Sequence, residues 1–137
     1  MSLDQLDPEL GNLLRGLTAE QLQSFARNAT TFAIESAGLV DEPVLSKALF
    51  GSGSQDEVTR RASELDEQYF SVGERREQGE ATDAEYLAAF AKARAAEAAR
   101  LLLVGGEPLE VAGDIAYEVQ SANETNGSVF LAIARDS

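Results

Sequence analysis

Three helix-start signals of the same kind divide this chain, and they limit its fold more than any other feature. In each, a Thr or Ser is followed three residues later by a Gln or Glu, at residues 18–21, 54–57 and 82–85. Side chains in this arrangement, the capping box, bind backbone N–H groups that the first turn of a helix leaves free. Long helices are therefore predicted at residues 19–37, 55–78 and 83–104.

Shorter helices are predicted between and around these three. Proline is favoured at the first position of a helix, which starts helices at Pro8, Pro43 and Pro108. The segment 128–135 is too short for its periodicity to separate helix from strand. No other segment alternates with a period of two, so a lone strand would have no partner, and a helix is favoured there. The predicted fold class is all-α: a single-domain bundle of five or six helices over residues 1–137, with short connections.

The core is predicted to come from three helices. In 19–37 apolar residues recur every three or four positions, which places them on one helical face. The segment 83–104 has nine alanines among its 22 residues and is apolar around most of its circumference, as expected of a central, buried helix. The segment 108–122 adds a third apolar face.

The long helix 55–78 has a narrower apolar seam, of the kind found where two helices pair along one edge. Its members follow alternating steps of four and three residues: Val58, Ala62, Leu65, Tyr69 and Val72. Phe70 points away from this seam. Self-association of the protein through helix 55–78, as a homodimer, is therefore one structural hypothesis.

The composition removes several classes of chemistry, because the chain has no His and no Cys. Histidine is the usual general base near neutral pH and the commonest metal ligand, and cysteine supplies thiol nucleophiles and thiolate metal sites. No catalytic residue, cofactor or metal site is predicted. A non-enzymatic protein is the favoured hypothesis.

The formal net charge of −13, from 24 acidic and 11 basic residues, limits the partners. Nucleic acids and anionic membranes are bound through Lys and Arg, so neither is expected as a partner. The first residues have no basic region followed by an apolar run, which favours a cytoplasmic location.

One row of acids is the candidate partner-binding site. Glu110, Asp114 and Glu118 lie one turn apart opposite the apolar face of helix 108–122, with Tyr117 beside them. Like charges at this spacing repel, and no cation of the same helix offsets them. The row is either a solvated outer face or a surface for a basic protein, as in an inhibitor, an antitoxin-like partner or an adaptor.

Glu97 is a second candidate, because it falls on the apolar side of helix 83–104. A charge buried there costs several kcal/mol unless it is paired. Arg94 and Arg100 each lie three residues away. The favoured interpretation is a buried ion pair at a helix crossing, and the alternative is a tuned acid in a cleft.

An enzyme remains as an alternative. All-α nucleotide pyrophosphatases hold Mg²⁺ with an E-x-x-E pair followed by an E-x-x-D pair, and residues 64–67 and 80–83 have these spacings. In so acidic a chain such pairs arise about four times by chance. Glu80 and Asp83 also lie on either side of the predicted helix start at Thr82, so they would not share a helical face.

Overall fold

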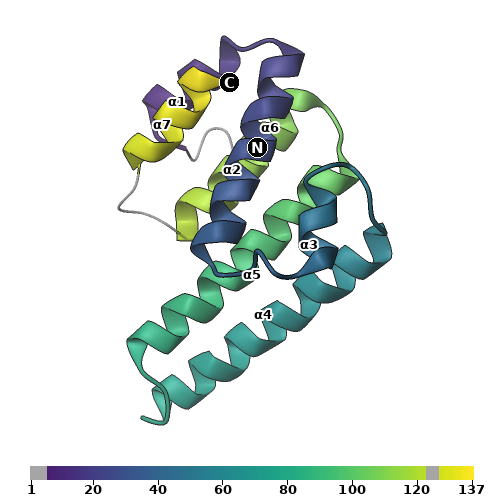
Figure 1. Cartoon of the computed structure of the whole chain (residues 1–137). Helices are drawn as coiled ribbons and strands as arrows, with labels where there is room; N and C mark the ends of the chain where they lie inside the picture. The colour runs from purple at the N-terminus through teal and green to yellow at the C-terminus, as the bar shows by residue number, and fades with distance from the viewer. Residues whose placement is uncertain (1–5, 123–126) are drawn as a thin grey trace.

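The protein is built from α-helices throughout the part of the chain that the structure describes. The computed structural model describes residues 6–122 and 127–137, and these contain no strand. These two ranges form seven helices: α1 (Pro8–Arg15), α2 (Ala19–Ser36), α3 (Pro43–Ala48), α4 (Gln55–Glu77), α5 (Asp83–Val104), α6 (Pro108–Ala122) and α7 (Gly127–Asp136). Figure 1 shows their arrangement. The all-α prediction is confirmed, but the count of five or six was wrong, because each of the short segments forms a helix of its own.

The three long helices begin at the predicted capping residues. At Thr18 the box is reciprocal: the Gln21 N–H donates to the Thr18 hydroxyl at 3.2 Å, and the Gln21 side chain accepts from the Thr18 N–H at 2.9 Å. At Ser54 and Thr82 the hydroxyl accepts from the N–H three residues on, at 3.4 and 3.1 Å. No return bond to the backbone is found at these two in the described chain. The box is therefore complete at α2 only.

α5 is the central helix, as its composition predicts. It packs against α2, α3, α4 and α6. Five of its alanines are buried, between Ala93 and Ala99, and such small side chains let several neighbouring helices approach one axis. Together α2, α5 and α6 supply more than half of the buried apolar side chains.

The opposite side of the molecule is closed by α1 and α7, which lie side by side in Figure 1. Phe130 of α7 is buried and meets Phe32 of α2 edge to face, with ring centroids 5.6 Å apart. Arg135 also pairs with Glu9 of α1 at 3.1 Å. The last described segment thus packs as a helix against α1 and α2.

α4 and α5 form a hairpin whose connected end projects beyond the other helices in Figure 1. The seam of α4 packs on α5, but only its first three members, up to Leu65, are buried. On α5 the buried positions begin at Ala93. We call residues 66–92 the distal hairpin; none of its side chains is buried.

No helix within the described ranges combines the length and the apolar character needed to cross a membrane.

Candidate functional site

The acidic row of α6 is divided by the way the helix packs. Glu110 is exposed and Asp114 is half-buried, and neither forms an ion pair with another described residue. Glu118 is different: its side chain is only 18% exposed and lies 2.7 Å from a guanidinium nitrogen of Arg94. Tyr117 is 38% exposed. As the sequence indicates, no cation of α6 offsets the row, but a cation of α5 neutralises one of its three members.

Arg94 is a junction between three helices. One of its terminal nitrogens binds Glu118 of α6, and the other binds Asp66 of α4, both at 2.7 Å. Burial lowers the pKa of Arg94, but the hydrogen bond and charge of Glu118 and the charge of Asp66 together raise it by more. The pKa of Arg94 therefore lies above its ordinary value. The guanidinium therefore stays charged and holds both carboxylates in place. Glu118 is thus part of the packing of the molecule.

Glu97 binds only one of its two candidate arginines. Nε of Arg100 lies 3.0 and 3.1 Å from the two carboxylate oxygens of Glu97, and both side chains are about one quarter exposed. This hydrogen bond raises the pKa of Arg100 above its ordinary value. Arg94 points instead to α4 and α6. The geometry is that of an ion pair along one helix.

The distal hairpin is held together by aromatic rings. Tyr69 of α4 lies 5.1 Å from the ring of Tyr86 and 5.2 Å from that of Phe90, both on α5, and its hydroxyl is 2.7 Å from the Tyr86 hydroxyl. The guanidinium of Arg76 lies over the Tyr86 ring at 3.8 Å. Gly73 leaves room for this ring, since a Cβ at that position would be 3.3 Å from it. Rings tilted by 41° and 50° to Tyr69 here take the place of the buried apolar core found elsewhere.

The outer surface of α4 presents an exposed aromatic ring among acids. Phe70 is 65% exposed and lies on the helical face of Glu67, Glu74 and Glu77, which are three residues before it, four after it and seven after it. None of these three carboxylates forms an ion pair with a described residue. We call these four residues the Phe70 face.

A hollow of about 290 Å³ opens beside this face. Glu74 and Glu77 border it together with the rings of Phe70 and Tyr86 and with Arg76, whose guanidinium covers one face of the Tyr86 ring. It therefore offers carboxylates next to aromatic surface. A long cationic side chain fits beside Phe70, because its alkyl stem can lie on this exposed ring while its charge meets Glu74 and Glu77.

The residues of the magnesium hypothesis are not brought together. Glu64 is bound to Arg61 at 3.1 Å, and Asp83 lies 3.7 Å from a nitrogen of Arg76. Glu67 and Glu80 are exposed. No group of three or more acids with the geometry to hold a metal ion is found in the described ranges.

The sequence predicts that Phe70 lies off the seam, but the acids around it were not predicted as part of a site. The signal was present: a helical projection of α4 centred on Phe70 places Glu67, Glu74 and Glu77 on the same face. From the sequence alone these acids could equally be paired with the Arg residues of α4, which lie close to them along the chain. Only the structure shows that Arg61, Arg75 and Arg76 turn to other carboxylates.

The described chain is therefore an all-helical protein whose projecting hairpin exposes an aromatic ring among carboxylates that form no ion pair with another described residue. No protein-family model, curated protein or solved structure matches the chain.

Proposed function

We propose that this protein is a non-enzymatic binding module that engages a basic protein partner through the Phe70 face. The observation that carries the proposal is Phe70, a large ring left 65% exposed among three carboxylates that pair with no cation in the described part of the chain. Exposed aromatic residues are the usual anchors of protein interfaces, and charges around them direct the approach of the partner.

The sign of the charge specifies the partner. The three acids of the Phe70 face pair with no cation of residues 6–122 or 127–137, although four arginines lie on the same helix. Two of these arginines cross the hairpin to Glu85 and Asp83. A partner with Lys or Arg around an apolar pocket would meet both the ring and the acids. The acidic row of α6 offers less, since Glu118 is occupied by Arg94 and leaves Glu110 and Asp114.

The test is capture of partners from the native host with the full chain and two matched variants. Phe70→Ala removes the anchor, and its cost at a well-packed interface is about 2 kcal/mol or more, roughly a thirtyfold loss of affinity. Phe50→Ala is the control, since Phe50 is 78% exposed on the α3–α4 connection, away from the Phe70 face. We expect a basic protein to be recovered with the unchanged chain and with Phe50→Ala, and to be lost with Phe70→Ala.

Salt supplies the second arm of the experiment. Ion pairs at an exposed rim weaken as ionic strength rises, so the same partner is expected to be released at high salt. Replacing Glu67, Glu74 and Glu77 together with Gln should weaken capture at low salt and reduce the effect of added salt. Recovery of the same proteins by all variants would overturn the proposal.

Self-association through α4 is less favoured by the same charges. A symmetric dimer about the Phe70 face would bring Glu67, Glu74 and Glu77 of one copy against those of the other, which is repulsive. Light scattering is expected to give the 14.6 kDa monomer at low salt. A stable dimer that Phe70→Ala dissociates would reverse this preference.

The magnesium hydrolase alternative has its own measurement. A shift of the melting temperature with Mg²⁺ or Mn²⁺ that Glu64→Gln or Glu67→Gln abolishes would support it over the binding module. The binding module predicts equal melting with and without these ions.

A further inference from the structure

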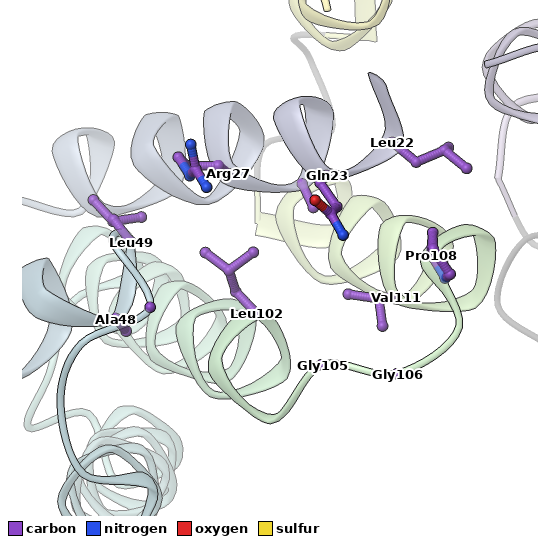
Figure 2. Close-up of a pocket in the computed structure, with 12 residues that line it drawn as sticks. Leu22, Gln23, Arg27, Ala48, Leu49, Leu102, Gly105, Gly106, Pro108 and Val111 are labelled. Atoms are coloured by element: carbon purple, nitrogen blue, oxygen red, sulfur yellow. The ribbon is translucent and has the colours of Figure 1, made fainter. Parts of the chain in front are cut away.

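A second hollow, remote in sequence from the Phe70 face, lies between α2, α3 and the turn from α5 to α6. Its volume is about 220 Å³. Apolar side chains line most of it, and the turn contributes only backbone, because Gly105 and Gly106 have φ values of 75° and 137° that favour glycine. Figure 2 shows Leu102 directed toward α2 from below and Leu49 beside it. We call this the α2–α6 hollow.

Its polar groups come from one helix. Gln23 and Arg27 of α2 lie one turn apart along the hollow, and Figure 2 shows Gln23 directed toward Val111. Both residues are exposed. Arg27 forms no ion pair with another described residue, in a chain where acids outnumber bases by more than two to one. An unpaired guanidinium at the edge of an apolar hollow is suited to an anion that carries an apolar group.

The backbone N–H groups at the start of α6, which could also bind an anion near the hollow, already donate hydrogen bonds within the chain. Glu107 accepts hydrogen bonds from the N–H groups of Leu109 and Glu110, at 3.2 and 2.8 Å. The positive end of α6 is thereby neutralised by the chain's own carboxylate. Arg27 is thus the group left to receive an external anion.

The volume limits the size of the apolar part. A cavity of about 150 Å³ lined by aliphatic side chains holds a benzene molecule. The α2–α6 hollow is larger by about half, enough for one ring and a short polar extension. Nucleotides and long acyl chains exceed it.

We propose that the α2–α6 hollow binds a small carboxylate whose apolar body is the size of one ring or a short branched chain. The carboxylate accepts hydrogen bonds from the Arg27 guanidinium, a geometry in which two parallel bonds form. The apolar body lies against Leu49, Leu102 and Val111, which line the hollow. This site is independent of the Phe70 face.

The experiment titrates the full-length chain, labelled for NMR, with phenylacetate and with phenylacetamide. The two probes share the ring and differ in charge. We expect phenylacetate to shift amide signals of α2, α3 and Gly105–Gly106 in a saturable way, and to bind about tenfold more tightly than the amide. Arg27→Gln should bring the two affinities together. Arg60→Gln, an equal change of charge on the exposed side of α4, should leave the tenfold preference unchanged.

Two results would overturn the proposal: equal binding of both probes to the unchanged chain, or the absence of saturable shifts at the hollow at millimolar phenylacetate. Gln23→Trp is the steric control, since Gln23 is exposed and a large ring there fills the hollow without entering the core. Binding that survives Gln23→Trp, in a chain whose circular dichroism is unchanged, would place the probe elsewhere and also contradict the assignment.

Discussion

Arg94 shows how one residue can link helices that are distant in sequence. Its partners, Asp66 and Glu118, lie 28 and 24 residues away, and the side chain itself is only 21% exposed. Each carboxylate on its own would be a poorly solvated charge at a helix contact. This guanidinium therefore links α6 to both helices of the α4–α5 hairpin.

Arg94→Met is expected to lower the free energy of unfolding by about 1–3 kcal/mol, between the values for exposed and buried ion pairs. Urea unfolding followed by circular dichroism measures it. Arg75→Met is the matched control: Arg75 lies 3.9 Å from Glu85 and both side chains are about half exposed, so a change below about 0.5 kcal/mol is expected. Equal losses in the two variants would show that Arg94 is not a structural junction.

Tyr69 is expected to make the folded protein less stable as the pH rises above 10. The hydrogen bond to Tyr86 and then burial raise the pKa of Tyr69 above its ordinary value near 10. Above this pH the folded chain holds the Tyr69 proton more tightly than the unfolded chain does, so the contribution is present below pH 10 and is lost as pH rises through the folded pKa.

Tyr86→Phe removes the hydrogen bond and is expected to move the pKa of Tyr69 down toward 10 and to reduce the loss of stability at alkaline pH. The chemical shift of the Tyr69 ring, followed by NMR through the titration, measures this directly. An unchanged titration of Tyr69 in the variant would contradict the assigned cause.

At the scale of elements, local signals in the sequence predict the helices well. The observed bounds of α5 and α6 equal the predicted ones, because capping residues, prolines and terminal glycines act within one turn of the helix ends. The seam of α4 also identifies the side that packs on α5. It does not predict where burial stops, since that depends on the length of hairpin that the other helices cover.

The three caps predict a graded effect on stability. Thr18→Ala removes the 3.2 Å bond that the hydroxyl accepts from the Gln21 N–H and leaves only the backbone half of the reciprocal box, and it is expected to cost about 1–2 kcal/mol. Ser54→Ala removes one long bond, of 3.4 Å, and is expected to cost about 0.5 kcal/mol. Thermal or urea unfolding of the two variants side by side tests the order. A larger loss at Ser54 would contradict it.

At the scale of the whole molecule, the distribution of charge matters more than its total of −13. The sequence points to α6 as the acidic surface, because no base of that helix lies near its acids. In the fold the Phe70 face keeps more unpaired acids than α6 does among the described residues. Arg94 of α5 pairs with Glu118 of α6, whereas Arg75 and Arg76 of α4 pair with acids of α5 and not with those of the Phe70 face. Which carboxylate an arginine binds depends on which helices are in contact, and the residue pattern of a single helix does not contain this information.

The most direct test of the proposed binding surface is zero-length carbodiimide cross-linking of the protein in lysate of its host, followed by mass spectrometry. This reagent joins a carboxylate to a lysine only where the two are in contact. We expect cross-links from Glu67, Glu74 and Glu77 to lysines of one basic protein, abolished by Phe70→Ala and retained in Phe50→Ala. Cross-links concentrated at Glu110 and Asp114, or spread over the exposed acids of all helices, would contradict the assignment of the Phe70 face.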